Sequence, residues 1–286
     1  MSPPTARPAG VVLSTVLLAA LLVAAGNHTA NAPVRSGAPL IAAPGVGVGS
    51  VKVAKRPLLE PNARPLAANR LYVAGGSGQR VLRFESGLAS VGAGVLEVRP
   101  NQAGNCAPGK QHASQILFRD RDGNGRFNRA VDKTSVRRDA GCMLFHPSHD
   151  HWHFEAAARY ALWDPDRPRD PVVVSRRKMS FCLRDTERAP ERWATPNYRQ
   201  YYGDCHRHTP QGISIGWVDV YGSYLPGQSL KLPRAMPTDV YCLRTTVDPQ
   251  NQLRESSNRD NHSLRAVRIQ GDRVTTKPTG RCRALD

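Results

Sequence analysis

No stretch of the 286-residue chain is apolar over the about 20 residues that a membrane-spanning helix needs. The longest largely apolar run extends from Val11 to Ala25 and follows a single positive charge at Arg7. This pattern is typical of a signal peptide, and the small residues of TANA, ending at Ala32, offer a cleavage site. We therefore expect residues 1–32 to direct export and the mature chain to have no membrane span. A retained anchor helix is the alternative.

Paired cysteine motifs are also missing, since none of the six cysteines belongs to a C-x-x-C pair. An even number of widely spaced cysteines in an exported chain favours three disulfides over a thiolate metal site. Spacing alone leaves the pairing open. We expect sequential pairing because it closes loops of modest length and keeps each bridge within one region. The expected pairs are Cys106 with Cys142, Cys182 with Cys205, and Cys242 with Cys282.

Acidic residues are scarce, with 23 Asp and Glu against 40 Lys and Arg, so the formal net charge is +17. Such a field attracts acidic polymers, anionic cell-wall material or nucleic acid. However, the sequence contains neither a zinc finger nor the aromatic signature of an RNA-binding sheet. We therefore expect a generally basic surface that binds anions weakly, and no specific nucleic-acid partner.

Stretches with helical periodicity are few, whereas proline and glycine are frequent, at 23 and 24 residues. Residues 33–68 are rich in Ala, Pro, Gly and Val and are expected to form a flexible lead-in. From there to residue 286, short β-branched or alternating stretches are separated by turn residues, which is typical of strands. They include NRLYV, YALWD, PVVVS, KMSFCL, GWVDVYG, VYCLRTTVD and SLRAVRI. The fold class expected for 69–286 is mainly β: one antiparallel β-sandwich-like domain with long loops and few short helices.

The stretch DRDGNGRFNRAVD places Asp120, Asp122, Asn124 and Gly125 where a calcium loop of the EF-hand type has its first ligands. Its twelfth position is Val131, which cannot supply the bidentate carboxylate that such a loop requires. The Asn-Gly pair is a strong turn signal. We therefore interpret this stretch as a turn.

The stretch HPSHDHWHFE holds four of the nine histidines. On an extended strand His149, His151 and His153 would share one face, which predicts a metal site. Same-face Cβ atoms lie about 6.5 to 7 Å apart, whereas nitrogens on one metal approach to about 3 Å, so the strand must bend or the rings must lean inward. An all-nitrogen site suits copper or zinc, and affinity favours Cu(II). Three protein ligands leave positions open, which favours a catalytic metal.

The segment HPSHDHWHFEAAARYALWD resembles the copper-binding segment of the lysyl oxidase family. RRKMSFCLRDT and HTPQGISIGWVDVYG resemble the two segments that supply that family's quinone, and the similarity extends from about residue 71 to residue 269. The resemblance implies that His149, His151 and His153 bind copper. His146 matches a further family histidine that is not counted among the ligands, so we expect it to support them by hydrogen bonding.

The same resemblance assigns the cofactor residues to Lys178 and Tyr221, which would be joined as lysine tyrosylquinone. Copper beside a phenol can promote its oxidation by dioxygen to a quinone that amines attack. Lys178 must then be neutral, which requires a pKa lowered by burial or by Arg176 and Arg177. Asp219 shares the strand face of Tyr221 and is the candidate base for the α-carbon proton of the substrate.

The implied function is a secreted, copper- and quinone-dependent amine oxidase of the protein-lysine 6-oxidase type, with residues 69–286 as its catalytic domain. It would convert primary amines, such as peptidyl lysine, to aldehydes, with dioxygen as co-substrate and hydrogen peroxide and ammonia as products. The basic surface favours amines carried on acidic polymers or proteins. The physiological substrate and the oligomeric state are left open.

The segment ESSNRDN resembles the calcium-binding segment of the family, which implies a calcium site. Its ligands would be Glu255, Ser257, Asp260 and Asn261. A serine replaces a carboxylate and Asp260 replaces an asparagine, and a plain acidic loop is the alternative. The cysteines also differ from those of the family. Ser148 stands where animal members have a half-cystine, and the family partner of Cys205 is absent. A bond between Cys182 and Cys205 would therefore be a rearrangement of the family pairing.

Two other functions fit parts of the pattern. The three histidines could bind zinc in a hydrolase, with Glu155 or Asp150 as the general base acting on a metal-bound water. Alternatively, the chain could be an extracytoplasmic copper-binding protein without catalytic activity. Quinone formation distinguishes the oxidase from both.

Overall fold

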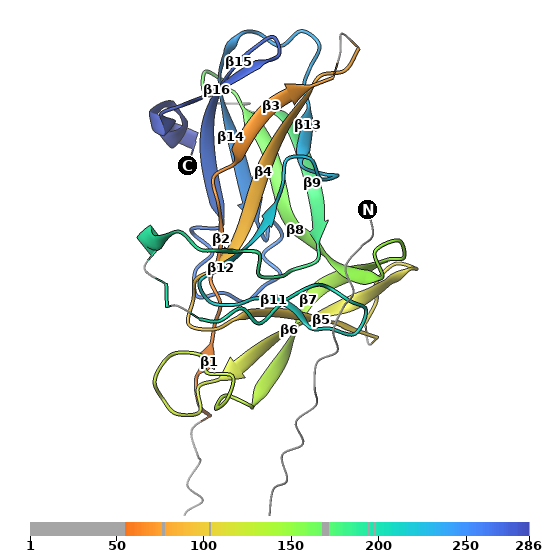
Figure 1. Ribbon diagram of the computed structural model, residues 1–286, viewed down its shortest axis with the longest axis vertical. Helices are drawn as coiled ribbons and strands as arrows, with labels where there is room; N and C mark the ends of the chain where they lie inside the picture. The colour runs from red at the N-terminus through yellow and green to blue at the C-terminus, as the bar shows by residue number, and fades with distance from the viewer. Residues whose placement is uncertain are drawn as a thin grey trace, which may run out of the picture. The chain divides into compact units, whose positions relative to one another are not determined.

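The computed structural model describes residues 55–75, 78–102, 104–167, 172–193, 195–196 and 198–285 (Figure 1). The expected signal peptide, and residues 33–54 of the expected lead-in, lie outside these ranges. The described chain is mainly β, with two short 3-10 helices, η1 (Glu191–Trp193) and η2 (Thr279–Leu285). The prediction of a mainly β fold with few short helices is confirmed. No helix in the described part is long and apolar enough to cross a membrane.

The smaller of the two sheets has six strands and is built around β4. Its strands are β2 (Ala63–Pro65), β3 (Asn69–Ala74), β4 (Val81–Ser90), β10 (Glu187–Arg188), β12 (Trp217–Tyr221) and β13 (Ser229–Lys231). β4 pairs with β2 and β3 and also with β12 and β13, all antiparallel. Because β4 is paired along its whole length, it fixes the position of β12, which ends at Tyr221.

The larger sheet has ten strands in the order β11-β5-β6-β7-β8-β14-β15-β16, with β1 paired to β6 and β9 paired to β8. They are β1 (Leu58–Leu59), β5 (Leu96–Asn101), β6 (Lys110–Arg119), β7 (Ser135–His146), β8 (His151–Trp163), β9 (Val172–Phe181), β11 (Gln211–Ile213), β14 (Asp239–Val247), β15 (His262–Gln270) and β16 (Arg273–Lys277). Residues 172–175 of PVVVS and 178–181 of KMSFCL, expected as two strands, belong to one continuous strand, β9. The long strand β8 carries the histidines at its start.

The two sheets share one hydrophobic core. Phe84 of β4 meets Tyr160 of β8 edge to face, with ring centroids 4.8 Å apart. The hydroxyl of Tyr160 lies 2.6 Å from Ser86 Oγ and accepts a hydrogen bond of 3.0 Å from Gln228 Nε2. A buried hydroxyl therefore keeps its partners inside an otherwise apolar layer. Packing of two antiparallel sheets through a common core agrees with the sandwich-like prediction.

The sequential disulfide pairing is confirmed. The three bonds are Cys106–Cys142, Cys182–Cys205 and Cys242–Cys282. The last bond attaches η2 to β14, where Cys242, Cys282 and Ala266 are fully buried together. Each bond links segments close in sequence, as the argument from loop length anticipated.

The folded unit begins before the expected boundary at residue 69. β1 and β2 lie within the stretch expected to be a flexible lead-in, and Leu59 and Ala63 are buried. Each strand is only a few residues long and is flanked by proline, so composition alone does not distinguish it from a linker. Pairing of these strands with β6 and β4 orders the segment.

The connection from β6 to β7 contains the Asn-Gly turn signal. Asp120 accepts hydrogen bonds from the backbone N–H groups of Gly123 and Gly125 at 2.7 and 2.8 Å, and Asp132 accepts two more from the loop at 2.7 Å. Carboxylate oxygens of Asp120, Asp122 and Asp132 lie within 4.8 Å of one another. Since backbone donors already engage both buried carboxylates, these residues fold the connection, which is much longer than a two-residue hairpin turn.

Candidate active site

The clustered histidines lie at the tip of the hairpin formed by β7 and β8. His151 and His153 share one face of β8, as alternation predicts. His149 lies outside the strand, in the turn that follows β7, and its N–H donates to the carbonyl of His146 at 3.0 Å. The prediction that one strand face carries all three imidazoles is therefore corrected for His149. The chain reverses direction, which removes the distance problem that a straight strand would pose.

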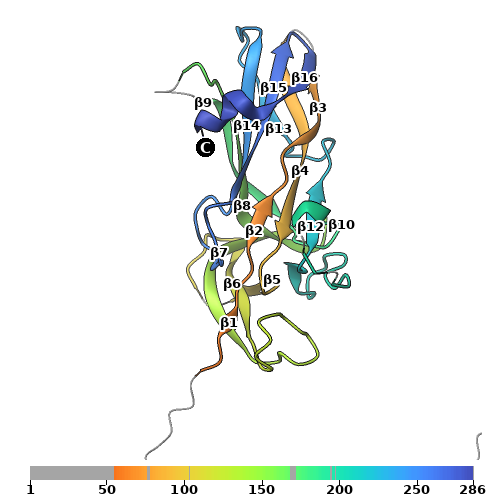
Figure 2. The same ribbon diagram turned by 90° about the vertical axis from the view of Figure 1, so that its left-hand side faces the viewer.

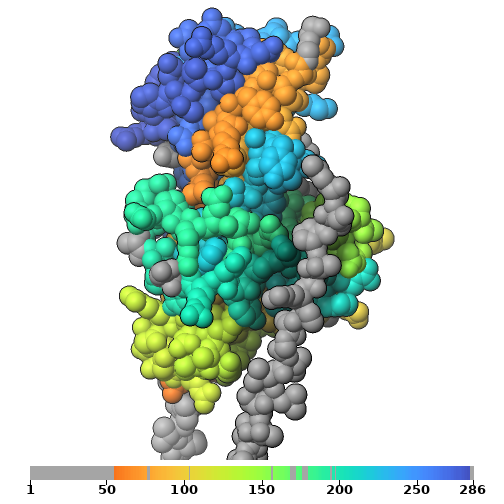
Figure 3. Space-filling model, viewed as in Figure 1, coloured from red at the N-terminus to blue at the C-terminus, as the bar shows by residue number. Residues whose placement is uncertain are grey.

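A neighbouring loop holds this turn in place. Asp150 has a backbone φ of +52°, and its Oδ1 accepts hydrogen bonds from Arg207 at 3.0 and 3.2 Å. The same guanidinium lies over the Phe145 ring at 4.4 Å. Gln211 Nε2 donates to the carbonyl of Trp152 at 2.5 Å. The segment from residue 198 to β11, teal in Figure 3, therefore fixes both sides of the hairpin tip.

The imidazole rings are close enough to share a metal ion. One nitrogen from each of His149, His151 and His153 lies within 4.8 Å of the others, and the Nε2 atoms of His151 and His153 are 3.0 Å apart. His146 stacks on His149 with centroids 4.2 Å apart, while its Nδ1 lies 3.0 Å from Ser148 Oγ. The structure thus brings the three expected ligands together and places His146 directly beside them.

Burial keeps the imidazoles of His151 and His153 in the form that binds metals. Burial, reinforced by the neighbouring histidines, lowers the pKa of His153 to about 4. Burial and His149 likewise lower the pKa of His151. Neutral imidazole is the ligand form, so no proton needs to be displaced near neutral pH. The donor set, three nitrogens without a thiolate or carboxylate, fits copper and leaves coordination positions open.

Tyr221 is the last residue of β12 and lies against the end of β9. Its ring stacks on Phe181 with centroids 3.9 Å apart. Its hydroxyl oxygen is 2.7 Å from the carbonyl oxygen of Cys182 and 2.7 Å from Asp219 Oδ2. Asp219 is 1 % exposed, and burial raises its pKa to about 8. The structure therefore places the candidate base in direct contact with the candidate cofactor tyrosine.

Lys178 belongs to β9 and lies three residues before Phe181. Its side chain, like those of Arg176 and Arg177, is outside the description, so the expected contact with Tyr221 stays a prediction. The strand itself is anchored beside the tyrosine through Phe181. Its neighbour β8 carries the histidines.

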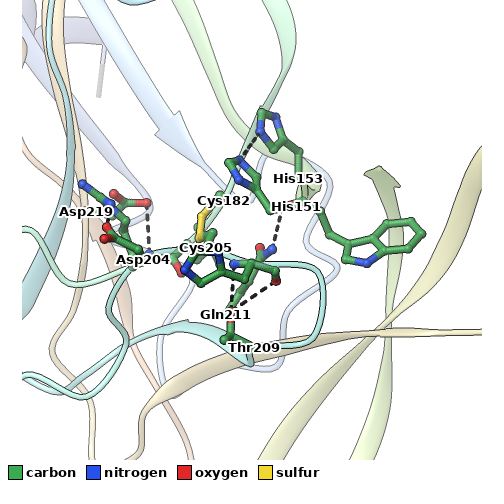
Figure 4. The surroundings of a disulfide bond; sticks show 12 residues. His151, His153, Cys182, Asp204, Cys205, Thr209, Gln211 and Asp219 are labelled. Atoms are coloured by element: carbon green, nitrogen blue, oxygen red, sulfur yellow. Dashed lines mark hydrogen bonds and ion pairs between the residues drawn. A yellow bond between two sulfur atoms is a disulfide. The ribbon is translucent and has the colours of Figure 1, made fainter. Parts of the chain in front are cut away.

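The Cys182–Cys205 disulfide lies between the two groups. Figure 4 shows His151 and His153 on one side of the bond and Asp219 on the other. Sequence reasoning missed this bridging position, and it also missed Arg207 and Gln211. No recognised spacing relates these residues to the histidines, and only the folded loop brings them there.

The expected calcium ligands lie in the connection from β14 to β15. Glu255 accepts a hydrogen bond from Asn261 Nδ2 at 2.9 Å, and Asp260 accepts one from Asn62 Nδ2 at 3.0 Å. One oxygen each of Asn62, Asp260 and Asn261 is buried without a hydrogen-bond partner. Buried oxygens of this kind suit a hard cation such as Ca²⁺. Asn62 is distant in sequence, so local spacing could not have identified it.

Two contacts modify this candidate cation site. Ser257 Oγ accepts the N–H of Arg259 at 3.2 Å and makes no hydrogen bond to the other expected ligands within the described chain. Arg64 Nε lies 3.0 Å from Asp260 Oδ2 and would share that carboxylate with a cation. Burial raises the pKa of Glu255 to about 7, an effect that a bound cation would oppose.

Both candidate bases of the zinc hydrolase are engaged with cations. Glu155 pairs with Lys110 Nζ at 2.8 and 2.9 Å, and Asp150 pairs with Arg207. A carboxylate that is already engaged by a cation is less free to contact a metal-bound water. These contacts therefore disfavour the hydrolase.

The comparisons with known proteins agree with the geometry. The family model described as Lysyl oxidase matches residues 123–279, more than half of the chain. Lysyl oxidase homolog 2 of Gallus gallus is 28% identical over 132 residues, which cover 46% of this chain and 16% of that protein. Lysyl oxidase homolog 3 of Homo sapiens is 25% identical over 146 residues, or 50% and 18%. The chain thus spans less than a fifth of these relatives. Its histidine hairpin and Tyr221 strand both fall inside the matched region, and the chain belongs to the lysyl oxidase family.

Proposed function

We propose that the chain is an exported, copper- and quinone-dependent primary-amine oxidase of the protein-lysine 6-oxidase type. The observation that carries the proposal is the contact between Tyr221 and Asp219 of β12, which lies against the end of β9, the strand that bears Lys178. The three-imidazole cluster stands at the start of β8, the strand paired with β9. Family membership supports the same chemistry.

In this proposal His149, His151 and His153 hold copper, and His146 supports the cluster by stacking. Copper bound there supplies the redox chemistry by which dioxygen oxidises a nearby phenol. Lysine tyrosylquinone made from Lys178 and Tyr221 supplies an electrophilic carbonyl for a primary amine. The overall reaction converts amine, dioxygen and water to aldehyde, hydrogen peroxide and ammonia.

In this proposal Asp219 acts as a general acid–base next to the quinone made from Lys178 and Tyr221. A carboxyl group with a pKa near 8 exchanges its proton close to neutral pH, where general acid–base catalysis is most effective. Its burial excludes water, and the backbone N–H of Arg184 lies 3.4 Å from the same Oδ2 atom. We assign Asp219 the removal of the α-carbon proton from the substrate amine.

Calcium is the second cation in the proposal. Asn62, Asp260 and Asn261 would each contribute an oxygen that is buried without a hydrogen-bond partner in the described chain, and Glu255 would add its carboxylate. The cation would tie the β14–β15 connection to the segment before β2, because Glu255 also accepts the N–H of Ala63.

The test is to express the mature chain with copper in air, and to measure visible quinone absorbance and peroxide release with a diamine and with a lysyl peptide. We expect both signals in the wild type and neither in Tyr221→Phe or Lys178→Ala. Tyr224→Phe and Lys231→Ala are matched controls, since both residues are exposed, and should keep both signals.

A copper-loaded, aerated wild type without quinone would overturn the oxidase and leave a copper-binding protein. Quinone and activity that survive in Lys178→Ala would overturn the crosslink while retaining the oxidase. Tight zinc binding with amidase or esterase activity would support the hydrolase instead.

A further inference from the structure

A basic groove lies between β7 and the connection that follows β14. It encloses about 640 Å³ and is lined by Arg119, Arg137, Arg138 and Arg254, among other residues. Figure 2 shows the connection beside β7. The groove belongs to neither candidate metal site, so its role is independent of the proposed oxidase.

Two of these arginines are free to bind a ligand. Arg137 and Arg138 are exposed on β7, and within the described chain neither guanidinium has a hydrogen-bond or ion-pair partner. In this half of β7 the ladder to β6 continues, while pairing with β8 is confined to residues 143–146. The other edge of β7 is therefore unpaired along this half in the described chain, and it borders the groove.

The remaining charges do not neutralise the groove. Within the described chain, the guanidinium of Arg119 donates to the backbone carbonyl of Arg56, at 2.7 Å, and contacts no carboxylate. Arg254 pairs with Glu60. The one carboxylate in the lining, Asp139, already contacts His112 Nε2 at 2.9 Å. Three arginines whose guanidinium groups have no acidic partner in the described chain thus line one hollow, which favours a ligand with several oxyanions.

The other lining groups narrow the class of ligand. They include two amides, Asn251 and Gln252, and aliphatic Leu58, Val136 and Leu253, with no aromatic ring. The absence of aromatic rings from this lining disfavours nucleic acid, whose bases stack on such rings. The amides can hydrogen-bond to hydroxyl groups and the guanidinium groups can bind oxyanions, so the lining fits a ligand that carries both. The volume falls in the range of about 300 to 1,000 Å³ typical of ligand sites and exceeds what one small anion needs.

We propose that this groove binds an acidic polysaccharide, with sulfate or carboxylate groups on Arg119, Arg137 and Arg138 and sugar hydroxyls on the two amides. Guanidinium groups bind either oxyanion in a bidentate manner. A polymer held there would keep the protein on an acidic matrix.

The test measures the affinity of the full copper-loaded protein for a highly sulfated octasaccharide and for a carboxylate-only oligogalacturonate, each over a range of salt concentrations. We expect Arg137→Ala/Arg138→Ala to weaken binding at least tenfold. The slope of log Kd against log salt should decrease by about two, because two ionic contacts are lost. The matched control is Arg268→Ala/Arg273→Ala, which removes the same charge from exposed positions on β15 and β16.

The control should change the affinity less than twofold, and thermal unfolding should show both variants folded. The saccharide that binds more tightly shows whether the groove prefers sulfate or carboxylate groups. Equal losses in the two double variants would overturn the proposal in favour of diffuse surface charge. Equally tight binding of polyglutamate or single-stranded DNA, with the same loss in the groove variant, would overturn the assignment to a polysaccharide.

Discussion

The hydroxyl of Tyr221 has one proton but lies 2.7 Å from two acceptors, the carbonyl of Cys182 and Asp219 Oδ2. The single O–H can be shared between the two acceptors, or a protonated Asp219 can donate the second hydrogen bond to the tyrosine oxygen. The raised pKa of Asp219, caused by burial, agrees with the second arrangement. At the residue scale, burial favours the protonated form of Asp219 below about pH 8.

A pH dependence of folding follows. The pKa of Asp219 rises from 3.8 to about 8 on folding, so the folded state binds the proton more tightly. Its contribution to stability is complete below pH 3.8 and is lost as pH rises towards 8. Asp219→Asn should remove this part of the slope. The measurement is the free energy of unfolding in urea of the metal-free protein between pH 4 and 9, compared with the wild type.

The comparison between the two proteins cancels the titration of the histidines, which is common to both. Asp204→Asn is the control, because Asp204 is exposed and pairs with Arg184, which also lies near Asp219. A slope in Asp219→Asn equal to that of the wild type would show that Asp219 ionises normally.

At the scale of the element, the β7–β8 hairpin shows where sequence reasoning succeeds and where it stops. The period-two pattern correctly places His151 and His153 on one face. It cannot show that the strand ends at His146, because the reversal depends on a turn with Asp150 in the left-handed region and on Arg207 from a distant loop. Residues that act across loops leave no local period to detect.

Arg207 should set the copper affinity through this turn. The Arg207–Asp150 pair is exposed, so we expect it to contribute at most about 1 kcal/mol, or about fivefold in affinity. Arg207→Ala should raise the Kd for Cu(II) by about three- to fivefold, measured by competition with a chelator. Arg192→Ala, which removes an arginine lying 5.4 Å over Trp193, should have no effect.

Asp150→Asn should resemble Arg207→Ala, and the double variant should be no weaker than either single variant. Additive losses would mean that the two residues act separately, and would refute the role given to their contact.

At the scale of the whole molecule, composition and turn spacing predict the two-sheet antiparallel fold and the disulfide framework. They do not predict the strand order, since β8 and β14 are neighbours although a long stretch of chain separates them. The strands β1 and β2 are not predicted for the same reason, because the strands they pair with lie further along the sequence. The candidate ligands follow from motifs, whereas Asn62 and the groove arginines emerge only from packing.

The length of β8 places the Cys242–Cys282 disulfide, which stabilises the fold, far from the candidate metal site. Cys242 pairs with Trp163 at the far end of β8, twelve residues after His151, which at about 3.3 Å per residue is about 40 Å away. Cys242→Ala/Cys282→Ala should lower the free energy of unfolding by about 2 to 4 kcal/mol. The Kd for Cu(II) of the folded protein should stay within twofold of the wild type. Calorimetry and chelator competition test the two statements separately, and a joint loss would contradict this separation.

The disulfide between the histidines and Asp219 imposes an order on maturation. Figure 4 shows the disulfide of Cys182 and Cys205 near His151 and His153. In the reduced chain these sulfurs would be soft ligands that compete for copper, above all as Cu(I). A chain that meets the metal too early would divide it between sulfur and nitrogen. Closing the bond first would remove the competitor, so under the proposed function we expect oxidation of the thiols to precede copper binding by the histidines.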